Sequence, residues 1–229
     1  MVNFRWIFGF FCLFMLAQIG QAQVNLKVGV STSYVLAGDH NAILNQFNSD
    51  YAQIVEKELP DLHFMTGVHF GIRYRMDQWG VDLSFQNLRR TRETFGETDS
   101  GGLFQKKYYY SINALTLSME YSTNPILSYG LGIGPRTVQI KRNIASSDKR
   151  KSILEKDKYQ WTVKAYLLFE FGGSTFTRFA IRPYFDYPLS NISLDNFIDN
   201  LALSTNYNGE KSDSFSAVGL SFIFYNGRQ

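Results

Sequence analysis

Apolar and polar residues alternate along several long stretches of this chain. In the clearest stretch, 24–36, Val24, Leu26, Val28 and Val30 occupy every second position, and mostly polar or small residues separate them. Because successive side chains of a strand point to opposite faces, this pattern predicts a strand with one apolar and one polar face. Similar alternation recurs at about 63–76, 81–86, 108–122, 127–136, 158–171, 178–187 and 217–224. We therefore expect an all-β protein with eight strands.

The connections between these stretches alternate in length. Three are about four residues long, namely 77–80, 123–126 and 172–175. The others are about four to six times longer, namely about 37–62, 87–107, 141–157 and 188–212. Short periplasmic turns and long external loops are typical of outer-membrane barrels, and an even strand count places both termini in the periplasm. The sequence therefore predicts an eight-stranded antiparallel up-and-down transmembrane β-barrel in the outer membrane.

Residues 1–22 have the pattern of a secretory signal peptide. Arg5 precedes an apolar run at 6–16, and we expect cleavage after Ala22. The run is shorter than the roughly 20 residues that a membrane-spanning helix needs. Because the only cysteine lies in this segment, we expect no disulfide, thiolate catalysis or cysteine-bound zinc in the mature chain. Residues 23–229 are expected to form one barrel domain.

The composition is compatible with a membrane barrel. The formal net charge of +3 gives no indication of a nucleic-acid partner, and the 16% aromatic content fits interfacial girdles. A soluble barrel such as a lipocalin is the alternative, with its apolar residues facing inward around a ligand. The export signal, the aromatic content and the loop asymmetry favour the membrane barrel.

Three segments carry a family resemblance: Phe70-Gly-Ile-Arg73, Tyr129-Gly-Leu-Gly-Ile-Gly-Pro135 and the aromatic-rich stretch Val218–Phe224. With them the chain resembles the PorT-like outer-membrane β-barrel family of Bacteroidota over residues 23–229. The chain departs from the aromatic C-terminus that is usual for such barrels, because Asn226-Gly-Arg-Gln229 follows Tyr225. The resemblance implies an outer-membrane barrel. Some relatives serve type IX secretion and gliding, but the resemblance does not place this chain among them.

The inward face of the predicted barrel carries charges of both signs. An eight-stranded barrel has an interior just wide enough for side chains, and buried charges are tolerated when they are paired. We therefore expect a paired polar core that fills the lumen; the alternative is a narrow, anion-leaning pore. The predicted lumen charge network comprises Lys27, Arg73, Arg75, Asp82, Glu120, Arg136, Lys164, Glu170, Arg178, Arg182 and Asp186.

Histidines are the candidate groups for catalysis or metal binding. Small outer-membrane enzymes carry histidine and serine on the barrel wall, but no outward wall position of this chain is a histidine. We expect no catalytic residues, no metal and no cofactor. A lipid-modifying outer-membrane enzyme is the third hypothesis for the function, and a metal site formed by Asp39, His40 and His63 is an alternative for the first loop.

Two of the long loops carry apolar residues at helical spacing. These are Ile43, Leu44, Phe47, Tyr51, Ile54 and Val55 in the first loop, and Leu194, Phe197, Ile198 and Leu201 behind Ser193 in the fourth. Because the last strand pairs with the first, we predict two short helices that pack together. They either bury only each other or present an apolar surface to a protein partner, formed by Phe47, Tyr51, Ile54, Phe197 and Leu201.

The third long loop is basic and holds Lys141, Arg142, Lys149, Arg150, Lys151, Lys156 and Lys158. Such a loop is either solvated or contacts lipopolysaccharide phosphates. The favoured function is a non-enzymatic integral outer-membrane β-barrel with a filled lumen. We expect it to act as a structural or interaction component, for example in a cell-envelope or secretion complex. Its expected partners are outer-membrane lipid, lipopolysaccharide and a protein at loops one and four.

Overall fold

The computed structural model describes residues 23–97, 101–144, 147–154, 159–172, 177–203 and 207–226. The predicted signal peptide at 1–22 lies outside these ranges, as do Lys156, Lys158 and most of the predicted turn at 172–175. No helix among the described residues is long and apolar enough to span a membrane.

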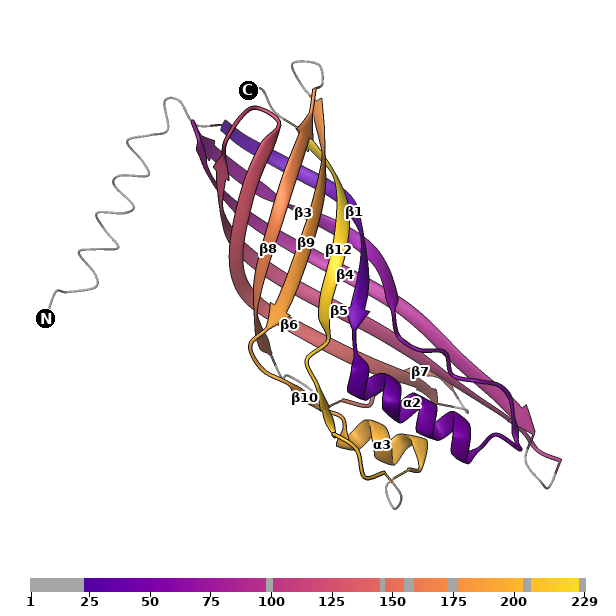
Figure 1. The fold of residues 1–229 in the computed structure, drawn as a ribbon. Helices are drawn as coiled ribbons and strands as arrows, with labels where there is room; N and C mark the ends of the chain where they lie inside the picture. Colours follow the sequence, from indigo (N-terminus) through magenta and orange to yellow (C-terminus); the bar gives the residue numbers. More distant parts are fainter. Residues whose placement is uncertain are drawn as a thin grey trace, which may run out of the picture.

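Eight long antiparallel strands close into a barrel (Figure 1). Each strand pairs with its neighbours in the chain, and the last strand pairs with the first over Leu26–Leu36. The predicted fold class is therefore confirmed. The barrel strands are β1 (Gln23–Leu36), β3 (Phe64–Met76), β4 (Trp79–Glu97), β5 (Leu103–Ser122), β6 (Leu127–Ile144), β8 (Gln160–Phe171), β9 (Thr177–Pro188) and β12 (Ser216–Asn226).

The connections differ strongly between the two ends of the barrel. At the end that we call the turn end, residues 77–78 join β3 to β4 and residues 123–126 join β5 to β6. At the opposite helix end, the long loops carry two helices, α2 (Gly38–Asp50) and α3 (Asp195–Leu201), which Figure 1 shows beside one another beyond the barrel. These loops also form the short strands β2 (Val55–Lys57), β7 (Ser147–Ser152), β10 (Ile192–Ser193) and β11 (Ser212–Asp213).

Both predicted loop helices are present, but the first is shorter than its apolar pattern indicated. The periodic residues run to Val55, whereas α2 ends at Asp50. Val55 and Lys57 instead belong to β2, which pairs with the extended end of β4. The second helix begins at Asp195 with Leu194 as its N-cap, so Ser193 lies one residue before the cap, where its hydroxyl accepts a hydrogen bond from the backbone N–H of Asp195 at 3.3 Å. The apolar spacing therefore predicted the position of α2, but its C-terminal end depends on the pairing of β2 with β4.

Strands β4 and β5 are much longer than predicted. The segment 87–107 reads as a loop in the sequence, but β4 continues to Glu97 and β5 begins at Leu103. Their register is unbroken from Trp79 opposite Tyr121 to Glu97 opposite Leu103. The sequence pattern hides this extension because the apolar residues change face along the strand.

The change of face is clearest on β5. Near the turn end, Leu117 and Met119 point outward and are exposed, and Ser118 lies inside. Toward the helix end, the inward positions become apolar, and Tyr110 and Ile112 are buried in the barrel. The barrel therefore has a lower zone that is apolar outside and polar inside, and an upper zone in which the interior is apolar.

Candidate functional site

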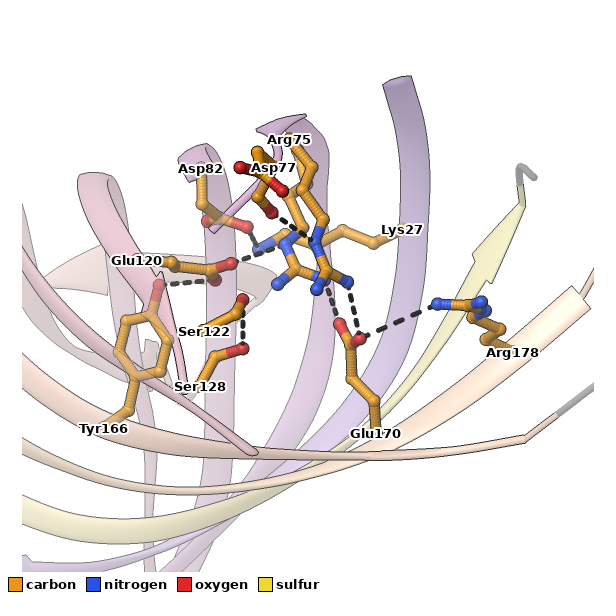
Figure 2. A network of polar contacts seen from close by, with 11 residues as sticks. Lys27, Arg75, Asp77, Asp82, Glu120, Ser122, Ser128, Tyr166, Glu170 and Arg178 are labelled. Carbon is orange, nitrogen blue, oxygen red and sulfur yellow. Dashed lines mark hydrogen bonds and ion pairs between the residues drawn. The ribbon is translucent and has the colours of Figure 1, made fainter. Parts of the chain in front are cut away.

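A network of buried ion pairs fills the part of the lumen nearest the turn end. Lys27 on β1 forms an ion pair with Asp82 on β4, and both side chains are fully buried. Arg73 on β3 lies between two acids: its Nε is 2.5 Å from Oε2 of Glu120, and its Nη1 pairs with Glu170. Figure 2 shows Lys27, Asp82, Glu120 and Glu170 gathered in this network. These charges are compensated by one another, as burial in a barrel requires.

Two arginines lie at the turn-end mouth of the network. Nη1 of Arg75 is 3.1 Å from Oε2 of Glu170, and Nη1 of Arg178 is 3.9 Å from the same oxygen (Figure 2). Their side chains are 18% and 21% exposed, so they mark the edge of the buried region. Deeper inside, Lys164 on β8 lies 3.3 Å from Asp186 on β9. Lys164 and Asp186 lie opposite each other on adjacent strands, whereas Arg73 and Arg75 on β3 reach Glu170 on β8 across the lumen.

Tyrosine rings cover several of the buried cations, a feature that the sequence interpretation missed. The guanidinium of Arg182 is 4.9 Å from the ring centre of Tyr166, and the ammonium of Lys164 is 4.5 Å from that of Tyr184. Both distances are typical of cation–π contacts. Tyr166 also donates a hydrogen bond of 2.7 Å to Glu120. The alternation of residues predicted that both tyrosines point into the barrel. It did not predict their contacts with Lys164 and Arg182, because the side chain of tyrosine is uncharged.

Neutral polar side chains complete the network. Arg182 donates to Nε2 of His69 at 3.1 Å, so this ring accepts from a cation inside the lumen. Lys164 donates to the amide oxygen of Gln86 at 2.7 Å, and the amide nitrogen of Gln86 donates to the hydroxyl of Tyr184 at 2.7 Å. These bonds fix the long cationic side chains in single positions.

Two glycines make room for the tyrosine rings. A Cβ added at Gly130 would lie 2.1 Å from a ring carbon of Tyr166, and one at Gly219 would lie 2.3 Å from a ring carbon of Tyr184. Both distances are far below any van der Waals contact. Each glycine lies directly opposite its tyrosine on the adjacent strand, so the absence of a side chain allows the ring to lie over the neighbouring strand inside the lumen.

Arg136 separates the polar network from the apolar interior above it. The residue is 1% exposed, and its guanidinium donates to the carbonyl oxygens of Ser214 and Phe215 at 2.6 and 3.0 Å. It also donates to Oε1 of Gln160 at 2.8 Å. We expected each lumen cation to pair with an acid. For Arg136 this prediction is wrong, because neutral oxygens bind its guanidinium instead.

Above Arg136 the interior is closed by apolar side chains, which we call the apolar cap. The two helices contribute one side of it, and the upper zones of the strands contribute the other. An apolar interior of this kind offers no polar groups to water or ions. The cap includes Ile43, Leu44 and Phe47 of α2, Phe197, Ile198 and Leu201 of α3, and Leu88, Tyr108, Tyr110, Ile112, Val138, Ile140 and Phe215.

The predicted partner surface lies largely inside this cap. Phe47, Phe197 and Leu201 are at most 2% exposed, because α2 and α3 pack on each other and on the barrel interior. These three residues cannot present an apolar surface to a partner, so that part of the prediction is wrong. Tyr51 and Ile54 are partly exposed at the end of α2.

His40 is a fully buried histidine at the centre of the apolar cap. Its ring stacks on Phe197 with 5.0 Å between centres, and its Nε2 lies 3.2 Å from the hydroxyl of Tyr110. Its backbone N–H donates to Asp213 at 3.0 Å. Burial lowers the pKa of His40 to about 4. The ring is therefore neutral at physiological pH, as its apolar surroundings require.

Acidification is expected to loosen the apolar cap through His40. An exposed histidine has a pKa of about 6.5, so between about pH 6.5 and 4 the opened cap binds a proton that the closed cap does not. Stability is therefore full above about pH 6.5 and decreases as the pH falls, by about 3 kcal/mol at pH 4. Hydrogen exchange of the α2 amides, corrected for intrinsic rates, measures this loss. His40→Gln should show a weaker pH dependence; equal dependence in both proteins would contradict the assignment.

The alternative of a metal site in the first loop has no support in the geometry. His63 lies at the surface, where it stacks on Tyr34 at 5.1 Å and lies 3.5 Å from Asp61. His40, in contrast, is enclosed in the apolar cap. Within the described ranges, no group of three or more histidine, cysteine, aspartate or glutamate side chains is placed to hold a metal ion.

The fold places the chain in the class of eight-stranded outer-membrane β-barrels. Ail, the attachment invasion locus protein of Yersinia pestis, superposes with a TM-score of 0.50 at 16% identity, covering 91% of this chain and 99% of that one. Neisserial surface protein A gives a TM-score of 0.46 at 7% identity, covering 90% of this chain and 97% of that one. These likenesses concern the fold alone. No protein-family model and no curated protein sequence matches the chain.

Proposed function

We propose that this chain is a non-enzymatic integral outer-membrane β-barrel with a closed lumen. Its outer surface supports the membrane placement, because the lower zone exposes a continuous apolar belt that would be unfavourable in water. The belt includes Val24, Leu26, Val28, Val30, Phe64, Val68, Phe70, Ile72, Leu83, Leu115, Leu117, Met119, Leu131, Ile133, Phe222 and Phe224, all at least 43% exposed. Trp79, Tyr121, Tyr129, Trp161 and Tyr187 supply aromatic side chains of the kind that gather at membrane interfaces.

The orientation follows from the two ends. In this proposal the turn end, where β1 begins and β12 ends, faces the periplasm, and the helix end lies outside the cell. Outer-membrane lipid and lipopolysaccharide then surround the barrel. In this proposal the chain acts as a structural or interaction component of the envelope, and α2, α3 and the long hairpin of β4 and β5 are the parts that reach a partner. Leu103, at the tip of this hairpin, is 86% exposed.

The observation that carries the closed-lumen proposal is the succession of two different fillings along the barrel axis. Ion pairs and tyrosine rings occupy the lower zone, and the apolar cap occupies the upper zone. An ion that entered from the turn end would meet paired charges and then an apolar region with no groups to replace its water. This arrangement supports a structural or interaction role over a pore.

Planar-bilayer recording tests the proposal directly. The full-length protein is expected to give no stable conductance steps at moderate voltage, because both zones of its lumen are packed with side chains. The inserted protein is checked by heat-dependent mobility on gels. Reproducible steps with selectivity for anions would overturn the closed-lumen proposal in favour of the narrow pore.

A further inference from the structure

A polar cavity of about 340 Å³ opens at the helix end, away from the lumen network. The hairpin of β6 and β7 forms one wall with Arg142 and Lys151, and α3 forms the facing wall with Asn196 and Asn200. Ile153 and Leu154 form its apolar part. The volume lies at the lower end of the range for small-molecule sites, about 300–1,000 Å³.

Arg142 and Lys151 place two positive charges side by side on one wall. The two residues are directly opposite in the β6–β7 register, where like charges are unfavourable unless something separates them. Within the part of the chain that the structure describes, no carboxylate forms an ion pair with either side chain. An anion in the cavity would bind both cations and relieve their repulsion.

The facing wall supplies neutral donors. Asn196 and Asn200 are four residues apart on α3 and therefore share one face of the helix. The hydroxyl of Tyr108 donates to Oδ1 of Asn200 at 3.4 Å, which leaves the amide nitrogen as the group that Asn200 can offer to a ligand. Two cations opposite two amides form a set suited to the oxygens of a phosphate and to hydroxyl groups next to it.

The apolar part of the cavity is held in place by the backbone. The N–H of Ile153 donates to the carbonyl of Ile140 at 2.8 Å, and the hydroxyl of Ser152 donates to the carbonyl of Leu154 at 3.2 Å. Both Ile153 and Leu154 are buried against the apolar cap. Their few exposed atoms give the cavity a small apolar edge beside its cationic wall, which suits a ligand that has an anionic group attached to a less polar ring.

We propose that this cavity binds the phosphate of a phosphorylated sugar. Arg142 and Lys151 bind the phosphate oxygens, the two asparagines donate to phosphate or hydroxyl oxygens, and the sugar ring packs on Ile153 and Leu154. Such a group occurs in soluble sugar phosphates and in the headgroup of a phosphorylated outer-leaflet glycolipid. Binding of a glycolipid headgroup requires the proposed orientation in the outer membrane, whereas binding of a soluble sugar phosphate does not.

The height of the cavity fits a headgroup. Trp161 points outward opposite Pro135 of β6 and marks the expected membrane interface. Arg142 lies seven residues further along β6, or about 23 Å along the strand and about 16 Å above the interface at a tilt near 45°. Sugars that extend from the outer leaflet would reach this level, whereas acyl chains would not.

Titration calorimetry on the full-length protein in detergent tests the site with glucose 6-phosphate as the probe and glucose as the unphosphorylated control. We expect glucose 6-phosphate to bind and glucose not to bind. Arg142→Gln combined with Lys151→Gln should weaken binding at least tenfold. Arg89→Gln combined with Lys211→Gln removes the same charge from exposed positions outside the cavity and should leave binding unchanged. Heat-dependent gel mobility confirms that every variant is folded.

The same variants, tested with purified lipopolysaccharide before and after enzymatic dephosphorylation, distinguish the two sources. Binding of glucose 6-phosphate that depends on Arg142 and Lys151 supports a soluble sugar phosphate. Binding of phosphorylated lipopolysaccharide alone, with the same dependence, supports the headgroup. If neither probe binds, the proposed site does not exist. If the control variant weakens binding as much as the double change in the cavity, binding reflects surface charge alone and the proposal is also overturned. The binding experiments test only the cavity at the helix end, and the conductance recording tests only the lumen, so the failure of one proposal is distinguishable from the failure of the other.

Discussion

Replacement of Asp82 by leucine is expected to lower the free energy of unfolding of the barrel by about 3–5 kcal/mol. The change leaves the ammonium of Lys27 buried without the carboxylate that compensates it. Desolvation of an unpaired cation costs far more than the ion pair itself contributes. Urea unfolding in lipid vesicles, followed by tryptophan fluorescence, measures the loss.

The matched variants are Lys27→Met and the combination of Lys27→Met with Asp82→Leu. Each single change leaves one buried charge behind, whereas the double change leaves none, so the double variant should be more stable than either single variant. A double variant that is as unstable as the sum of the single variants would show that the two charges are not coupled. The result would then contradict the description of the lumen as a network of compensating ion pairs.

Replacement of Phe197 by alanine is expected to lower the stability of the apolar cap by about 3–5 kcal/mol. The ring is fully buried and contacts His40 and Tyr108, with ring centres 5.0 and 5.6 Å apart. Its removal leaves a cavity between α3 and the upper interior of the barrel. Hydrogen exchange of the α2 and α3 amides should accelerate strongly, while the β1 and β12 amides of the lower zone should remain protected.

Phe224→Ala is the matched control for this prediction. It removes the same atoms from a side chain that is 54% exposed on the apolar belt, so no cavity forms in the protein interior. Exchange at α2 and α3 should then stay close to that of the unchanged protein. If both variants accelerate exchange equally at the helices, the cap is not an independent packed unit, and the helices depend on the barrel as a whole.

Alternation along the strands was sufficient to predict the barrel, because a strand with one lipid-facing side has to repeat every second residue. The same pattern placed Lys27, Arg73 and Glu120 inside. The pattern did not predict the upper parts of β4 and β5. There the apolar side chains point inward, so the outward apolar residues that identify a lipid-facing strand are missing. Ile112, for example, is out of step with the outward residues Leu115 and Leu117 because it points into the barrel.

Other parts of the site depend on three-dimensional proximity that a local pattern does not contain. The backbone oxygens that solvate Arg136 come from Ser214 and Phe215, nearly eighty residues later in the chain. The burial of Phe197 depends in the same way on where α3 packs. Helical spacing identifies an apolar face, but only the neighbouring chain decides whether that face is covered.

The reversal of the apolar side along β5 also has a consequence for how the protein sits in a bilayer. A displacement toward the turn end would draw Ser111 and Asn113, on the outside of the upper zone, into hydrocarbon. A displacement in the other direction would lift Leu115 and Leu117 into water. Both movements are unfavourable, so the change of apolar side along β5 itself favours one vertical position of the barrel in the bilayer.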